Sequence, residues 1–264
     1  MKRTLIDGGL IVTLDADRRI IQDGAVLIAG DKILAVGPSR QVKYDYEYDE
    51  SLSAANKVVL PGFIDTHVHL SKHIFRSLVP DDAEDWMSHW LLPLYASLTP
   101  EEEYYAALLA FIEMIRSGTT TFCEAGTLMY PESAIEAMEA VGIRGILGSW
   151  TWDLPESPSR LSQSTDAALK KISGLMDAVR GRKNPLIQSW PLVLGMETAS
   201  DELMIGAKKL ADAYGCGMGF MHASSIPSME TRDSIRSLKY FQDLGILDKN
   251  VKITHLVYTE DEDL

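Results

Sequence analysis

Four of the six histidines in this chain stand where they can bind one metal ion. His67 and His69 are two residues apart, so on a strand their side chains project to the same face. His222 and His255 follow later apolar segments, and each of the four comes at the carboxyl end of a predicted strand. Neutral imidazoles on rigid strands suit a borderline divalent ion. The pattern therefore predicts a site for one such ion, with Zn²⁺ expected and Fe²⁺ as the alternative.

The repetition of histidine at strand ends carries this prediction. A single histidine at such a place is more often a hydrogen-bonded core or surface residue. His255 follows Val251 and Ile253 with a period of two, which predicts that all three share an inward face. The other two histidines, His73 and His89, lack a placement of this kind, and we expect them to be structural or to support the site from outside.

The first part of the chain contains short apolar stretches separated by Asp-Gly, Asp-Ala-Asp and Gly-Asp turns, which are typical of a small β-sheet subdomain. The predicted strands there are Leu5–Ile6, Gly9–Leu14, Gly24–Ala29 and Lys32–Val36. The polar segment 44–50 is expected to be a loop. We expect residues 1–57 to form the N-terminal portion of a β-sandwich.

From residue 58 onward, strand and helix patterns alternate. The predicted strands are Val58–Ile64, Thr119–Cys123, Ile143–Trp150, Leu186–Leu194, Gly217–Met221 and Val251–His255. The intervening segments have helix-end signals; Thr99-Pro100-Glu101-Glu102 is a capping box, and Gly118 ends that helix. Alternating βα units predict an α/β fold, in which residues 58–264 form a partial TIM-type (β/α) barrel of about six of the eight units. Barrel enzymes carry their chemistry at the carboxyl ends of the strands, where the four histidines fall.

Composition narrows the class of partner. The net charge of −13 argues against nucleic acid, whose binders show a clustered basic face. The two cysteines, Cys123 and Cys216, form no CxxC pair, which favours a reducing compartment. The N-terminus lacks a signal-like apolar region, and no apolar run reaches membrane-spanning length. We therefore expect a cytoplasmic protein that acts on a small molecule, with neither nucleic acid nor membrane as partner. The sequence does not decide between a monomer and a homo-oligomer.

The last residues contain one more helix-opening signature, Thr259-Glu260-Asp261-Glu262, two residues before the final Leu264. We expect a C-terminally truncated chain that lacks about two βα units of the barrel. An open barrel leaves edge strands unpaired. The chain by itself is therefore expected to bind metal weakly, to aggregate and to be inactive.

The segment Val59–His69 reads VLPGFIDTHVH and resembles the PGxxDxHxH signature of the amidohydrolase superfamily. Other segments are similar to the branch that contains the methylthioadenosine/S-adenosylhomocysteine deaminases and the atrazine chlorohydrolase group. These segments are Arg76, the Trp86 region, Leu92-Pro93, Leu98-Thr99, residues 113–121 and Ser200–Leu203. The resemblance covers essentially the whole chain and implies a metal-dependent hydrolase.

The resemblance also implies roles for the four histidines. His67, His69 and His222 match the metal ligands, and His255 matches the catalytic residue that acts as general acid/base or orients the reacting water. The branch takes its fourth ligand from an aspartate at the end of the eighth strand, which this sequence does not reach. A binuclear site would need a bridging lysine at the end of the fourth strand; the predicted strand Leu186–Leu194 holds none, so a single metal is favoured.

Three positions depart from the deaminases of this branch. Ser225 stands where they have a proton-shuttling glutamate, Leu194 where they have a histidine, and Tyr95 where they have a ribose-binding glutamate. A serine cannot replace a carboxylate as proton shuttle, because general acid/base catalysis needs a pKa near the working pH. These departures argue against a nucleoside substrate.

The expected reaction is hydrolysis of a non-peptide carbon–nitrogen bond in a small cyclic or aromatic molecule. Trp86 and Tyr95 are candidates for an aromatic wall of the substrate site, against the alternative that they are core residues. Glu124, at the end of the second barrel strand, is a candidate substrate contact or a support for a metal-binding histidine. Dehalogenation also stays open.

Two other functions remain as alternatives. One is deamination of a purine or another heterocycle, with a shuttle residue supplied from elsewhere. The other is a catalytically inactive amidohydrolase-like scaffold, which the departures at Ser225 and Leu194 would fit. The four histidines argue against a scaffold, because it has no reason to keep polar imidazoles around an inward-facing cavity.

Overall fold

The computed structural model describes residues 1–80, 86–154, 161–195, 198–222 and 237–257. The chain divides into two compact units, Met1–Phe63 and Ile64–Leu264. The sequence features at Ser225 and at Thr259–Glu262 lie outside the described residues.

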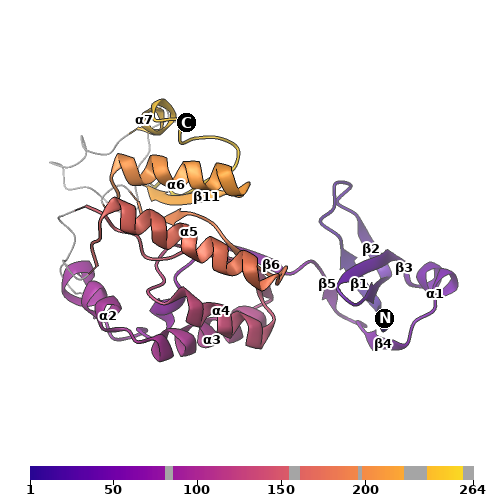
Figure 1. The fold of residues 1–264 in the computed structure, drawn as a ribbon. Coiled ribbons are helices and arrows are strands. Elements are labelled where there is room, and N and C mark those ends of the chain that lie inside the picture. Colours follow the sequence, from indigo (N-terminus) through magenta and orange to yellow (C-terminus); the bar gives the residue numbers. More distant parts are fainter. Residues whose placement is uncertain (81–85, 155–160, 196–197, 223–236, 258–264) are drawn as a thin grey trace. The chain divides into compact units, whose positions relative to one another are not determined.

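The first unit is a sheet with a short helix. Its strands are β1 (Arg3–Val12), β2 (Ile20–Ala29), β3 (Lys32–Pro38), β4 (Glu50–Ser53) and β5 (Val58–Val59). The order is β3-β2-β1-β4, with β5 also paired to β1 (Figure 1). The antiparallel pairs β1–β2 and β2–β3 are hairpin neighbours, whereas β4 and β5 run parallel to β1.

Two predictions for this unit were wrong in their boundaries. The two predicted strands before residue 15 form the single strand β1, which contains register shifts between Asp7 and Ile11. The segment expected as a loop begins inside helix α1 (Ser39–Asp45) and ends at the start of β4. Val42 anchors α1 to the sheet, since it is 4% exposed and packs with Leu5 and Leu27. The local polar sequence does not reveal this tertiary contact.

The second unit contains the strands of the predicted barrel. They are β6 (Phe63–Val68), β7 (Thr119–Glu124), β8 (Arg144–Leu147), β9 (Ile187–Ser189), β10 (Leu192–Val193), β11 (Met218–His222) and β12 (Val251–His255). They form two sheets, of order β6-β7-β8-β9 and β10-β11-β12. The pairs β7–β8, β8–β9, β10–β11 and β11–β12 are parallel, so the predicted α/β class is confirmed.

Proline interrupts two of the predicted barrel strands. The strand predicted over Val58–Ile64 ends at Val59 and resumes as β6 beyond Pro61. The strand predicted over Leu186–Leu194 is divided into β9 and β10 around Trp190-Pro191. Proline has no N–H to donate to a neighbouring strand, which is why pairing stops there. β9 pairs with β8 and β10 pairs with β11, so this broken strand contributes to both sheets.

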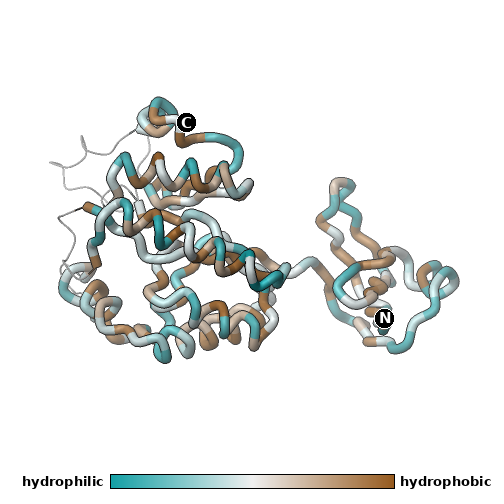
Figure 2. The backbone as a smooth tube through the Cα atoms, viewed as in Figure 1, coloured by the Kyte–Doolittle hydropathy of each residue, from teal (hydrophilic) through white to brown (hydrophobic). Residues whose placement is uncertain are grey.

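Helices alternate with these strands in the sequence. They are η1 (Leu70–His73), η2 (Met87–Leu91), α2 (Leu92–Ser97), α3 (Pro100–Arg116), α4 (Pro131–Val141), α5 (Thr165–Arg182), α6 (Asp201–Tyr214) and α7 (Leu238–Asp243). The predicted capping box is confirmed: Thr99 caps α3 and accepts from Glu102 N at 3.2 Å. Brown and teal residues alternate along α5 and α6 in Figure 2, as expected for helices that bury one face.

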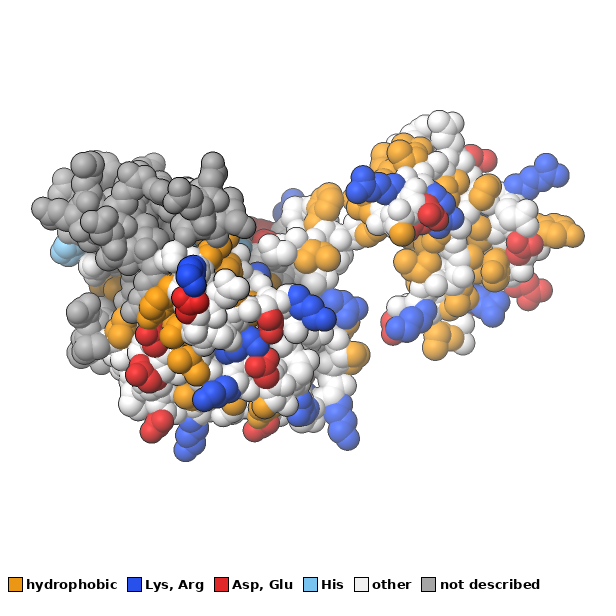
Figure 3. Space-filling model, turned by 90° about the horizontal axis from the view of Figure 1, so that it is seen from above, with side chains coloured by type: hydrophobic (Ala, Val, Ile, Leu, Met, Phe, Trp, Pro, Cys, Tyr) orange, Lys and Arg blue, Asp and Glu red, His pale blue; other side chains and the backbone are white. Residues whose placement is uncertain are grey.

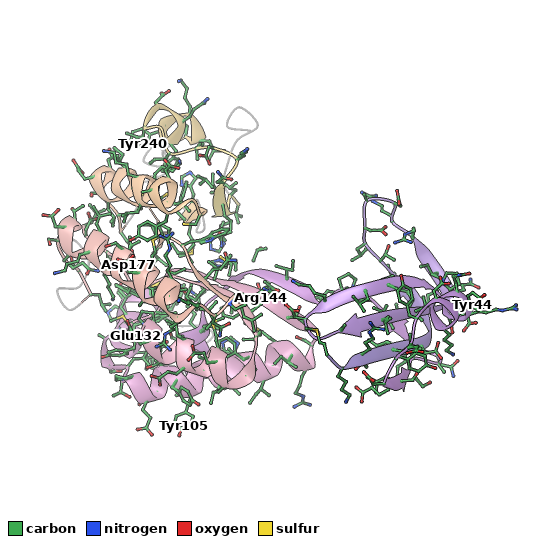
Figure 4. All side chains as sticks on the ribbon, turned by 45° about the vertical axis from the view of Figure 1, so that its right-hand side comes forward. Tyr44, Tyr105, Glu132, Arg144, Asp177 and Tyr240 are labelled. Atoms are coloured by element: carbon green, nitrogen blue, oxygen red, sulfur yellow. The ribbon has the colours of Figure 1, made fainter. Side chains whose placement is uncertain are left out.

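Two apolar clusters hold the helices of this unit in place. One joins α3, α4 and α5 around Phe111, Phe122 and Leu147. The other joins α5, α6 and α7 around Met218, Phe220 and Phe241. On α6, the Tyr214 hydroxyl also donates to Asp177 of α5 at 2.7 Å, and Figure 4 labels Asp177 on that helix.

The outer face of α3 is more apolar than a solvated helix surface requires. Tyr105, Leu109 and Ile112 lie at helical spacing and are 56%, 40% and 51% exposed. Figure 4 shows Tyr105 projecting outward from α3. On the face of the molecule in Figure 3, lysine and arginine are interspersed with aspartate and glutamate, without a continuous basic area. Among the described helices none is long and apolar enough to span a membrane.

Candidate metal centre

The HxH pair lies where β6 ends and η1 begins. His67 is within β6, and its backbone N–H donates to Asp65 Oδ1 at 3.0 Å. His69 keeps an extended backbone as the residue before η1. The ring centroids of the two histidines are 4.9 Å apart with nearly perpendicular planes. The sequence spacing therefore brings the two imidazoles into contact, as predicted.

His255 reaches the same place from the end of β12. Its ring centroid lies 4.9 Å from that of His67. The predicted reason for this placement was wrong, because Val251 and Ile253 pack with the cluster of α5, α6 and α7. His255 instead has a positive φ of 79°, which interrupts the strand alternation. A left-handed non-glycine residue is uncommon, and here it accompanies a functional candidate.

His222 ends β11, the strand next to β12. It is paired in register with His255 and is 6% exposed. Its ring packs edge-on against Phe241 of α7, with centroids 5.1 Å apart. Across the part of the chain that the structure describes, no group of three His, Cys, Asp or Glu side chains has the arrangement of a metal site. The ring contacts thus join His67, His69 and His255, whereas His222 lies one strand away against Phe241.

The chemistry of the histidines fits a divalent ion. Burial lowers the pKa of His67 to about 4 and that of His69 to about 2, and it also lowers the pKa of His255. All three rings are therefore neutral near pH 7 and can offer a nitrogen lone pair. Within the part of the chain that the structure describes, His67 Nδ1 is buried and has no hydrogen-bond partner. A buried polar atom of this kind normally has a partner, and an ion at this position would supply it.

A buried carboxylate supports His69 from behind. Glu124 ends β7 and has no exposed surface. Its Oε1 accepts from Thr127 Oγ1 at 2.5 Å, and Thr127 Oγ1 lies 3.1 Å from His69 Nδ1. Burial raises the pKa of Glu124 to about 7, and hydrogen bonds from Thr127 and Gly126 oppose that rise. Of its two predicted roles, this arrangement favours support of a metal-binding histidine.

A second buried carboxylate, Glu103, was not identified from the sequence. It lies on α3 and accepts from Ser71 Oγ and from the backbone N–H groups of Met129 and Tyr130, the latter at 3.0 and 3.3 Å. Burial raises its pKa. The sequence feature that could have identified Glu103 is its position four residues before Ala107, on the buried face of the helix. Glu103 ties η1, which follows the HxH pair, to α3 and to the loop after β7.

The two aromatic candidates occupy different surroundings. Tyr95 is 1% exposed and packs between Phe75 and Trp150, with ring centroids at 5.5 and 5.0 Å. Burial raises the pKa of its hydroxyl, and the nearby hydroxyls of Thr127 and Ser71 oppose that rise. Trp86 precedes η2 and is 46% exposed. Tyr95 therefore belongs to a buried aromatic cluster, whereas Trp86 lies at the surface.

That aromatic cluster contains further residues that sequence reasoning did not single out. Trp150 and Trp152 stack at 4.5 Å on the segment after β8, and Leu194 packs against the same cluster. The Trp152 indole N–H and the hydroxyls of Ser149 and Thr151 are buried and have no hydrogen-bond partner among the described residues. Unpaired buried polar groups are costly.

Sequence comparisons relate the chain to a known family. The family model of the amidohydrolase family matches residues 58–263. A 5-methylthioadenosine/S-adenosylhomocysteine deaminase of Syntrophus aciditrophicus is 30% identical over 266 residues, which cover 99% of this chain and 58% of the relative. A 5'-deoxyadenosine deaminase of Methanobrevibacter smithii is 32% identical over 241 residues, or 89% of this chain and 53% of the relative. The chain thus spans less than two thirds of the length of these relatives.

Solved structures show the same fold. An adenosine deaminase from Xanthomonas campestris with bound zinc aligns with a TM-score of 0.87 and 22% identity, over 98% of this chain and 59% of the other. The atrazine chlorohydrolase TrzN of Arthrobacter aurescens, complexed with zinc, aligns with a TM-score of 0.85 and 20% identity, over 98% and 62%. These alignments support the predicted partial barrel. By its sequence match, and in agreement with its fold, the chain belongs to the amidohydrolase family.

Proposed function

We propose that this protein is a metal-dependent hydrolase that cleaves a non-peptide carbon–nitrogen bond in a small cyclic or aromatic molecule. The main support for the proposal is the contact of three neutral imidazoles at the ends of two strands of an amidohydrolase. The ring centroid of His67 lies 4.9 Å from that of His69 and 4.9 Å from that of His255. Zn²⁺ is the proposed ion, since two solved proteins of the same fold are described with zinc.

The histidines divide into two roles. His67, His69 and His222 are the proposed ligands, and a bound divalent ion supplies a Lewis acid that makes water nucleophilic near neutral pH. His222 supports this role by its place at the end of β11, in register with His255 on β12, with its ring edge-on to Phe241. His255 is the proposed general acid/base: its ring is exposed, neutral and in contact with His67.

Metal content tests the ligand set. We expect the purified full-length protein, rather than residues 1–264 alone, to hold about one zinc per molecule. His67→Ala and His222→Ala should each lower that content sharply, because each removes a proposed ligand. His89→Ala, an exposed histidine on η2, is the matched control and should leave it unchanged. Unchanged zinc content in both ligand variants would refute the assignment.

Deamination of a heterocycle is the second candidate, favoured by the names of the two relatives. Ammonia release from adenine nucleosides, compared with turnover of substituted triazines and cyclic amides, separates the two candidates. Turnover of the nucleosides alone would support the deaminase. The absence of turnover in the zinc-loaded full-length protein would support an inactive scaffold instead.

The free thiols of Cys123 and Cys216 also support a reducing, cytoplasmic location. Fractionation of cells that produce the protein would test this location, and recovery of the protein outside the cytoplasm would overturn it.

A further inference from the structure

The turn after β7 is built to hold the carboxylate of Glu124 in one orientation. Gly126 N–H donates to Oε2 at 2.6 Å, and Thr127 N–H contacts Oε2 at 3.0 Å and Oε1 at 3.2 Å. Gly126 has a φ of +82°, and a Cβ there would lie 2.3 Å from the carbonyl oxygen of Leu192. Only glycine therefore allows the backbone to direct both N–H groups at Glu124.

The hydroxyl of Thr127 makes the third contact with this carboxylate. Its distance of 2.5 Å to Oε1 is in the range of a charge-assisted O–H···O⁻ bond. A hydroxyl has a single proton, which this bond uses. The side of Oγ1 that faces His69 Nδ1, at 3.1 Å, therefore offers a lone pair. The proton between Thr127 and His69 must come from the imidazole.

A neutral imidazole carries one N–H, so a proton on Nδ1 leaves the lone pair on Nε2. We propose that Glu124 and Thr127 are positioning residues that fix His69 in its Nδ1–H tautomer and thereby reserve Nε2 for a metal ion. The use of Nε2 by a metal rests on the proposed function, whereas the tautomer itself does not. Metal-binding histidines commonly donate their second nitrogen to an oxygen, and such partners set ring orientation and affinity.

The reverse arrangement would need Thr127 to donate to His69 and Glu124 to donate to Thr127. Both carboxylate oxygens already face backbone N–H donors, which favour the ionised form as acceptor. Lys72, half-buried on η1, also attracts the Glu124 carboxylate electrostatically. Burial and the nearby Glu103 oppose ionisation of Glu124. At about pH 8, above its pKa of about 7, the backbone donors and Lys72 nevertheless favour donation from His69 to Thr127 to Glu124.

Imidazole ¹⁵N shifts of the metal-free protein, labelled at histidine and measured at about pH 8, report the tautomer directly. We expect His69 to be the Nδ1–H form in the wild type and in Thr127→Ser, which keeps the hydroxyl. Thr127→Val keeps the side-chain shape and removes the acceptor, so it should move His69 towards the Nε2–H form. Thr120→Val, an exposed threonine on β7, is the matched control and should match the wild type. An Nε2–H tautomer in the wild type, or an unchanged tautomer in Thr127→Val, would overturn the relay.

Zinc affinity, measured by competition with a chelator, tests the consequence. We expect Thr127→Val to weaken zinc binding about 10- to 100-fold, and Thr127→Ser to stay close to the wild type. A changed tautomer with unchanged affinity would overturn the positioning role. If the wild type bound no zinc, the proposed function would fall, and the tautomer of His69 in the same protein would still decide whether the relay exists.

Discussion

Lys252 Nζ, on β12, donates to the backbone carbonyl of Thr66, on β6, at 2.7 Å. β6 and β12 belong to different sheets, and the two residues are far apart in the sequence. The bond links β6, which contains His67, to β12, which ends in His255. It is a direct contact between the two strands, which are not neighbours in either sheet.

Lys252→Met should destabilise the second unit, because methionine keeps most of the apolar stem but cannot donate. A hydrogen bond from a charged group contributes about 1.5–3 kcal/mol, so we expect a loss near the lower end of that range in urea unfolding. Lys239→Met is the control, since Lys239 forms an exposed pair with Asp243. Equal stability losses in the two variants would show that the bond to Thr66 adds nothing.

Gly126→Ala should cost more than Gly142→Ala, although both glycines have positive φ, at +82° and +78°. A Cβ at Gly142 meets nothing within 4 Å, so only the left-handed backbone is penalised, by about 1–2 kcal/mol. A Cβ at Gly126 also collides with backbone atoms of Leu192. Thermal unfolding of both variants measures the difference, and a smaller effect at Gly126 would contradict the described turn.

Thr99→Ala should remove the capping box of α3, in which Thr99 N–H donates to Glu102 Oε2 at 2.9 Å and Thr99 Oγ1 accepts from Glu102 N. Loss of an N-cap side chain costs about 0.5–2 kcal/mol. Thr99→Ser keeps the hydroxyl and should retain most of the stability. Urea unfolding of the three proteins tests this, and a serine variant as unstable as the alanine variant would exclude a capping effect.

Glu124 should make stability depend on pH. Its folded pKa of about 7 lies above the ordinary value of 4.5, so between these values the folded chain holds a proton that the unfolded chain releases. This stabilising contribution is complete below pH 4.5, the ordinary pKa, and is lost as the pH rises to about 7, the pKa in the folded chain. Relative to Glu124→Gln, the wild type should therefore lose stability as the pH rises through this window.

Urea midpoints of the two proteins across that window measure the effect, with Glu136→Gln, at an exposed site on α4, as control. A constant difference between the wild type and Glu124→Gln would mean that the carboxyl group is not perturbed by burial. A pH-dependent difference in the control would point to a general charge effect.

Local sequence signals predicted most of the scaffold that carries the candidate site. The alternation of apolar strands with capped helices indicated the α/β class, and Thr99 caps α3 as expected. These features depend on neighbours within a few residues, so they can be read from the chain. Strand interruptions at Pro61 and Pro191 were missed because the apolar run continued past each proline.

The PGxxDxHxH segment is enough to identify the family. Its spacing also places His67 and His69 on one face, because side chains of a strand repeat every two residues. Which residues meet this pair depends on the packing of distant elements. His255 contacts His67 from a residue with left-handed backbone angles, and His222 lies against Phe241. Thr127 connects His69 to Glu124. These contacts join separate strands and turns, and no local periodicity encodes where such elements come together after folding.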